Sequence, residues 1–270
     1  MNLILWFSYP FVQKAFIAGV MLAVIAGILG VLMQIRRSTF FGEAIAHSAL
    51  AGVALAFLWG INPLIGALVY AGLFSMAIPV LQKTSKLSTD TILGILFPFS
   101  MGLGVIVFSL LPAAQPQLMS YLFGNMLMIN ISDLWILLVI LLLLLLLLTL
   151  YFKQWLLISL DREYAQLLKI KVGTHDLLYH IFLALVVIIG VRLVGVILVT
   201  TLLVVPVSIA RLFAKSAKQV FILSPIIGIF IMVFGLMLSI LLNAPTGASI
   251  AVFAGLAFFL TLLLSLLKNK

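Results

Sequence analysis

A glutamate and a histidine four residues apart, Glu43 and His47, are the residues of this sequence best suited to chemistry. Positions i and i+4 of a helix lie on one face, one turn apart. Carboxylate and imidazole groups are ligands for divalent transition metals, and an ionisable pair within an apolar helix indicates a functional site. The residues around the pair are small, which allows another helix or a substrate to approach closely.

The same pair also has a structural interpretation. Glu43 follows Arg36 and Arg37, so it could form an ion pair with one of them at the edge of a membrane and favour the start of a helix. His47 would then hydrogen-bond a neighbouring helix. The spacing alone leaves both interpretations open. The chain has no Cys, which excludes a thiolate metal site and a cysteine nucleophile.

The helices that must position this pair cross a membrane. Hydrophobic residues make up 66% of the 270-residue chain and charged residues 8%, against about 25% charged in a soluble domain. Runs such as 135–151 are continuously apolar, whereas a membrane barrel would alternate. We therefore expect an all-α polytopic transmembrane helix bundle that forms one transmembrane domain over residues 1–270. The expected spans are 13–35, 41–60, 62–82, 91–112, 133–152, 176–191, 193–213, 219–242 and 246–267, and eight spans are the alternative because the sixth is short.

The basic residues predict the orientation of these spans. All but two of the 15 Lys and Arg residues follow the odd-numbered spans, and the exceptions are Lys14 and Arg192. The positive-inside rule makes that side cytoplasmic, so we expect the N-terminus outside and the C-terminus inside. The net charge of +9 is thereby attributed to orientation in the lipid bilayer, and no nucleic-acid partner is expected.

Two connections are long enough to have structure of their own. Leu118–Ile129 is apolar but too short to span, which predicts a short re-entrant or interfacial helix. The cytoplasmic loop at about 153–175 contains Leu160, Tyr164 and Leu168 at helical spacing. This pattern fits a surface helix that binds a soluble partner, or one that lies on lipid. We expect Gly173 to end this helix and Asp176 to cap the next span.

Several short motifs occur in a fixed order along the chain: Phe41-Gly42-Glu43-Ala44-Ile45-Ala46-His47-Ser48, Asp90-Thr91-x-x-Gly94-Ile95-x-Phe97, Tyr121-Leu122-Phe123-Gly124, Asp161-x-Glu163-x-Ala165 and Val194-Gly195-x-x-Leu198-Val199. In this order and spacing the chain resembles the permease subunits of the metal-importing ABC transporters, the ABC-3 type family of zinc, manganese and iron uptake. It departs from the family pattern at three positions. Glu43 stands where Asp is more frequent, Lys169 where Gly is frequent, and Asn125 where an acidic residue is frequent.

The resemblance implies a type II importer-like fold and a homodimer with the translocation path between its subunits. Cytoplasmic ATP-binding subunits would dock on the loop after the fifth span, through Asp161, Glu163, Ala165 and Leu168. An extracytoplasmic metal-binding protein would deliver the ion, and Glu43 and His47 would hold it within the membrane. The implied location is the inner or plasma membrane.

The chemistry of the pair narrows the expected cargo. Two-fold symmetry would bring two glutamates and two histidines together, a set that suits tetrahedral zinc, with manganese or iron as alternatives. No permanently bound cofactor is expected. The chain lacks the G-x-x-x-x-G-K-[ST] sequence, so it is not expected to be an enzyme and ATP hydrolysis is assigned to a partner. The alternative function is a stand-alone proton-coupled metal carrier, with Glu43 and His47 as a proton relay.

Overall fold

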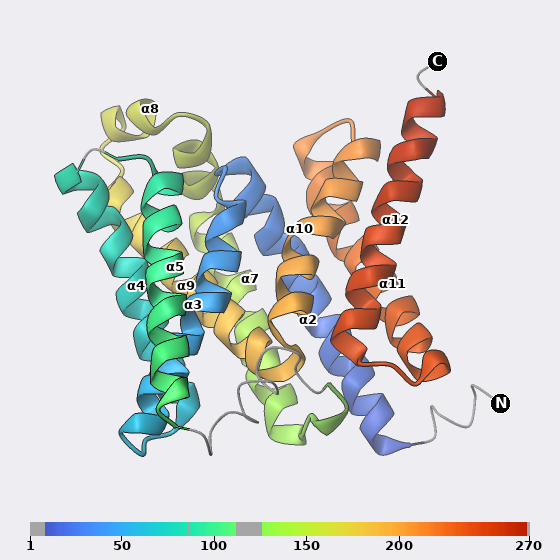
Figure 1. Cartoon of the computed structure of the whole chain (residues 1–270). Coiled ribbons are helices and arrows are strands. Elements are labelled where there is room, and N and C mark those ends of the chain that lie inside the picture. The colour runs from blue at the N-terminus through green and yellow to red at the C-terminus, as the bar shows by residue number, and fades with distance from the viewer. Residues whose placement is uncertain (1–8, 86, 112–125, 269–270) are drawn as a thin grey trace. The chain divides into compact units, whose positions relative to one another are not determined.

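The structure is a computed structural model that describes residues 9–85, 87–111 and 126–268. Within these ranges, nine helices are long and apolar enough to cross a membrane (Figure 1). They are α2 (Pro10–Ile35), α3 (Thr39–Leu58), α4 (Pro63–Ser85), α5 (Thr89–Ser109), α7 (Ile131–Leu160), α9 (Val172–Val194), α10 (Val196–Phe213), α11 (Ala217–Leu242) and α12 (Thr246–Lys268). The other described helices are the single-turn η2 (Met126–Met128) and α8 (Arg162–Leu167).

The predicted all-helical fold and nine spans are therefore confirmed. The sixth span, which the sequence marked as short, is α9 with 23 residues. Gly195 separates it from α10 and has a φ of 88°. Glycine reaches this backbone region without a steric penalty, so a single residue ends one span and begins the next.

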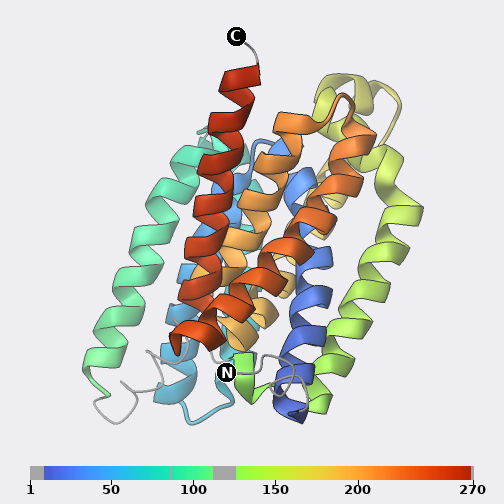
Figure 2. The same ribbon diagram turned by 90° about the vertical axis from the view of Figure 1, so that its right-hand side faces the viewer.

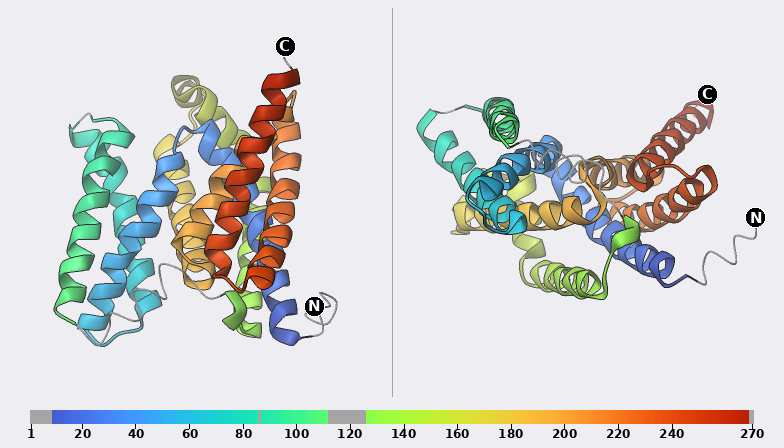
Figure 3. Two further views of the ribbon diagram at one scale, coloured as in Figure 1. Left: turned by 45° about the vertical axis from the view of Figure 1, so that its right-hand side comes forward. Right: turned by 60° about the horizontal axis from the view of Figure 1, so that its bottom comes forward.

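The helices group into two compact units, and each is described by itself. Unit 2 comprises Ile35–Leu122 and Tyr151–Arg192, and in it α3 packs against both α4 and α5 (Figure 3, left). A Cβ atom on Gly66 would collide with the carbonyl oxygen of Gly52, and one on Gly104 would press on the backbone of Ala51. These glycines let the backbones of α4 and α5 reach α3, which leaves most of α3 buried.

Unit 1 comprises Met1–Gln34, Phe123–Leu150 and Leu193–Lys270. In its described part, α10, α11 and α12 lie side by side (Figure 2). Helix α2 joins them through small residues, because Gly30 lies against the backbone of Leu203 and Gly27 against Pro225. The hydroxyl of Ser224 donates a hydrogen bond of 2.9 Å to the carbonyl of Gly27. Nε2 of Gln34 on α2 also donates a hydrogen bond of 3.0 Å to Oγ of Ser208 on α10, and many of the other buried side chains of these helices are apolar.

The connection after the fifth span is shorter than predicted. Helix α7 continues to Leu160 and α9 begins at Val172, so much of the expected loop at 153–175 is helix and α8 occupies the remainder. The prediction that Gly173 ends α8 is wrong, because Gly173 lies in α9. Lys169 ends α8 instead, with a φ of 59°. Most of the predicted re-entrant segment, Leu118–Ile129, lies outside the described residues, as does Asn125.

Candidate functional site

Glu43 and His47 lie on α3, one turn apart, on the narrow stripe of this helix that unit 2 leaves uncovered. Glu43 is exposed and His47 is half-buried, while the residues between them are buried. The exposed Phe40 continues the stripe toward the start of the helix. The helix thus presents its carboxylate and imidazole together and buries its small residues against α4 and α5.

The ring of His47 is positioned by α5. Its centroid lies 5.6 Å from that of Phe97 at 60°, and Phe97 also contacts Phe40 edge-on at 5.9 Å. The Nδ1 atom of His47 is buried and has no hydrogen-bond partner among the described residues. An imidazole nitrogen in this state retains its capacity to hydrogen-bond or to bind a metal ion.

The expected alternative for Glu43, an edge ion pair with an arginine, is absent from the described residues. Arg36 pairs instead with Asp176, with 3.0 Å between Nη1 and Oδ1. Arg37 forms no ion pair with Glu43 in this part of the chain. The carboxylate of Glu43 is therefore not committed to a neighbouring cation.

The other acidic residues are placed at helix starts or in an ion-pair cluster. Asp133 and Asp161 accept hydrogen bonds from backbone N–H groups at the starts of α7 and α8. Asp90 and Glu163 lie in the first turns of α5 and α8. Asp176 is paired with arginine. Acidic side chains at these positions stabilise helix N-termini. Only Glu43, among the six acidic residues of the chain, lacks such a structural explanation in the described structure.

One chain does not supply a complete metal site from its described residues. Among them, no group of three or more His, Cys, Asp or Glu side chains is close enough to hold a metal ion. Glu43 and His47 could together provide two ligands, and a divalent transition metal takes four or more. A metal ion held by this pair would therefore need further ligands from water molecules or from another chain.

The predicted docking residues fall into different environments on and around α8. Asp161 caps the helix and accepts a 2.9 Å hydrogen bond from the N–H of Tyr164. Glu163 and Leu168 are exposed. Ala165 is fully buried against Ile158 and Val172, so it anchors α8 to unit 2 and offers no surface to a partner.

Asp176, like Gly173, lies elsewhere than the sequence predicted. It was expected to cap the sixth span, but α9 begins four residues earlier and Asp176 lies inside it. There it forms ion pairs with both Arg36 and Arg162. The signal that could have identified this role was the presence of one acidic residue within an apolar span, since such a charge requires a partner.

Comparison with known proteins supports the same architecture. Residues 8–265 match the sequence model of the ABC 3 transport family. The chain is 35% identical to the manganese import system permease protein ScaB of Streptococcus gordonii, over 94% of this chain and 91% of that protein. It is 32% identical to the high-affinity zinc uptake system membrane protein ZnuB of Haemophilus influenzae, over 92% and 95% of the two chains.

A solved structure shows that the likeness extends to the fold. PsaBC from Streptococcus pneumoniae in complex with Fab contains a chain that matches with a TM-score of 0.81 and 31% identity, over 94% of this chain and 91% of that one. This chain is thus a multi-pass permease subunit of an ABC transporter, and it is not itself catalytic. It belongs to the ABC 3 transport family, and the resemblance to metal-uptake permeases found in its motifs is confirmed.

Proposed function

We propose that this permease carries a divalent metal ion, manganese or zinc, into the cytoplasm, driven by ATP hydrolysis on separate subunits. The observation that carries this proposal is the pair on α3. Glu43 has no ion-pair partner in the described structure, and His47 keeps a buried Nδ1 atom without a hydrogen bond. A carboxylate and an imidazole with open ligand positions are suited to a hydrated divalent ion that must exchange water for protein ligands.

A second copy of the chain would complete the site. Two-fold symmetry around a shared path supplies two carboxylates and two imidazoles from identical residues. The two carboxylates offset the 2+ charge of the ion where the dielectric constant is low. Because the ion must also leave, a site assembled from two subunits suits transport, since a small relative movement changes its affinity.

The choice of metal has two kinds of support. Four protein ligands of this type fit tetrahedral zinc, which is the cargo that the ligand chemistry favours. The chain is 35% identical to a manganese permease and 32% identical to a zinc permease, which supports both metals. Carboxylate and imidazole with added water also fit the larger coordination number of manganese.

The partners and orientation follow from the family and the charges. The basic ends of the spans would face the cytoplasm, with the N-terminus outside, and an extracytoplasmic binding protein would deliver the ion. ATP-binding subunits would contact α8 through the exposed Glu163 and Leu168. Asp161 would contribute by holding α8 folded, because its carboxylate caps that helix.

The test is uptake of Mn²⁺ and Zn²⁺ into proteoliposomes that contain the permease, its ATPase and its binding protein. We expect uptake to require ATP, and Glu43→Gln and His47→Gln each to reduce it by at least about tenfold, the effect of losing one metal ligand or its partner. Asp90→Asn is the matched control, because Asp90 is an exposed acid at a helix start. The proposal would be contradicted if uptake continued without ATP, or if both the Glu43 and the His47 variants took up metal at the wild-type rate.

The docking surface is tested by co-purification of the ATPase. Glu163→Arg reverses a charge on exposed α8 and is expected to weaken the association. Asp161→Ala removes the cap and is expected to weaken it as well, at a cost of about 1 kcal/mol to the helix, whereas Asp161→Asn keeps a capping side chain and should retain the partner. Loss of the ATPase in the asparagine variant would show that the charge of Asp161 itself is needed.

A further inference from the structure

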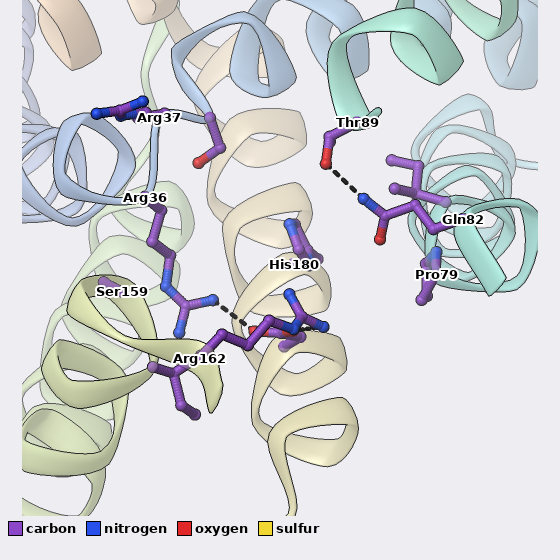
Figure 4. A pocket seen from close by; sticks show the side chains of 12 residues that line it. Arg36, Arg37, Pro79, Gln82, Thr89, Ser159, Arg162 and His180 are labelled. Carbon is purple, nitrogen blue, oxygen red and sulfur yellow. Dashed lines mark hydrogen bonds and ion pairs between the residues drawn. The ribbon is translucent and has the colours of Figure 1, made fainter. Parts of the chain in front are cut away.

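A cavity of ≈ 130 Å³ opens at the end of unit 2 where α3 and α5 begin (Figure 4). Its volume is roughly ten times the ~10–15 Å³ that one water molecule needs. Arg36, Arg37 and Arg162 line it, and Asp176 is the acidic residue among the lining side chains. Three guanidinium groups against one carboxylate leave a net charge of +2 at the cavity wall.

Both oxygens of Asp176 are already in use. Its Oδ1 lies 3.0 Å from Nη1 of Arg36, and its Oδ2 lies 2.8 Å from Nη2 of Arg162. The two guanidinium groups converge on this one residue of α9. The carboxylate therefore fixes the two arginines in place but cannot neutralise both of them together with Arg37.

Arg36 retains an unused hydrogen-bonding edge. Its side chain is 8% exposed, and its Cζ atom lies 4.2 Å from the centre of the Tyr179 ring. Its Nε and Nη2 atoms are buried and have no hydrogen-bond partner among the described residues. These two N–H groups form the fork that binds two oxygens of one phosphate or carboxylate group. Leaving them unpaired is costly, because each buried N–H without an acceptor costs about 1–3 kcal/mol.

The rest of the wall also favours an anion. His180 lines the cavity. Ser38 and Thr89, at the N-termini of α3 and α5, lie on the wall as well. Two long helices thus direct their positive ends to the same space. Water would satisfy single donors but would leave the charge of +2 uncompensated.

We propose that this cavity is a binding site for a phosphate group, either inorganic phosphate or the headgroup of a phospholipid. Arg36 would turn its buried, unpaired Nε and Nη2 edge toward two of the phosphate oxygens. Arg162 would supply a second cation, and Asp176 would hold both arginines near the cavity. The site is separate from Glu43 and His47, and it does not depend on the proposed metal transport. An occupied site would join α3, α5, α8 and α9 through one ligand.

The experiment is a thermal-unfolding titration of the full-length chain in detergent, with sodium phosphate compared with sodium chloride at equal ionic strength. We expect phosphate to raise the melting temperature. Arg36→Lys keeps the positive charge but removes the fork, and Arg162→Gln removes the exposed cation with less risk to folding. Each is expected to weaken phosphate binding by about tenfold, as for the loss of a charge-assisted hydrogen bond. Arg211→Lys, in unit 1, is the matched control and should leave the response unchanged.

Asp176→Asn separates this site from a purely structural ion-pair cluster. The variant is less stable without ligand, but it frees both arginines and should bind phosphate more tightly by at least about threefold, because a competing negative charge is gone. The proposal is overturned if phosphate acts no more strongly than chloride on the wild type and the wild type retains no more phospholipid than Arg162→Gln does. It is also overturned if the Arg36 and Arg162 variants match the wild type both in their response to phosphate and in lipid retention.

Native mass spectrometry distinguishes the two sources of the group. A phospholipid that is retained by the wild type and lost in Arg162→Gln identifies a lipid headgroup. Equal lipid retention in both proteins, together with stabilisation of the wild type by phosphate, identifies the free ion.

Discussion

The end of α8 provides a direct test of backbone strain, because Lys169 has a left-handed backbone conformation that residues other than glycine rarely adopt. Its φ is 59°, and two hydrogen bonds fix it there. The N–H of Lys169 donates to the carbonyl of Gln166 at 2.9 Å, and the N–H of Ile170 donates to that of Ala165 at 3.1 Å. This is the Schellman arrangement, in which the left-handed residue is usually glycine. We predict that Lys169→Gly stabilises the turn.

The magnitude follows from two opposing terms. Relief of the left-handed conformation contributes about 1–2 kcal/mol. The larger entropy of the unfolded glycine backbone then lowers the stability of the turn by about 0.5–1 kcal/mol. The net stabilisation is about 0.5–1 kcal/mol, which corresponds to a two- to fivefold smaller population of the open turn. Lys169→Ala is the control, because it removes the amine but keeps the Cβ atom and hence the strain.

The assay is amide hydrogen exchange of the segment 161–171 in the purified full-length chain. We expect the amide of Ile170 to exchange about two- to fivefold more slowly in the glycine variant, because its hydrogen bond to Ala165 opens less often. The alanine variant should exchange at the wild-type rate. Equal protection in the two variants would refute the reasoning, since it would assign the effect to the lysine side chain.

Two further predictions compare matched residues within unit 2. Gly66→Ala should lower stability by about 1–3 kcal/mol, because the added methyl group meets the backbone of Gly52, whereas Gly72→Ala on the same helix meets nothing within 4 Å and should not destabilise. Denaturant or thermal unfolding of both variants measures the difference. Arg36→Gln should lower the free energy of unfolding by about 3–5 kcal/mol, because it leaves Asp176 buried with only an exposed partner. Arg162→Gln should lower it by at most about 1 kcal/mol, because the side chain of Arg162 is 57% exposed. Similar losses in both arginine variants would refute the second prediction.

The spans were predictable because the membrane imposes their length and composition. Apolar runs near the length of a bilayer and the one-sided distribution of Lys and Arg were sufficient to obtain nine spans. Their ends were less predictable, because polar residues such as Lys153 and Asp176 lie within helices when a long side chain reaches water or a partner neutralises the charge. Lys169 shows the same limit, since the one sign of its left-handed conformation was the glycine that the family frequently has at this position, and nothing in the neighbouring residues indicated it.

The pairing of buried charges was not predictable, because it depends on which helices become neighbours. The sequence places Arg36 and Arg37 together, and either could have been the partner of Glu43. The structure separates their roles. Arg36 is buried and held by Asp176 and Tyr179, while Arg37 takes a φ of 53° in the turn that leads into α3.

This division of roles bears directly on the candidate metal site. If Arg36 were paired with Glu43, the carboxylate would be neutralised and a metal ion would have to displace a cation to bind. Because Asp176, 140 residues away in the chain, pairs with Arg36 instead, the carboxylate of Glu43 has no arginine partner in the described structure and lies on the exposed stripe of α3. If Glu43 binds the metal ion, Asp176 would affect that site without touching it. Its replacement by asparagine would free Arg36 to compete for Glu43, so metal binding should weaken together with the loss of stability.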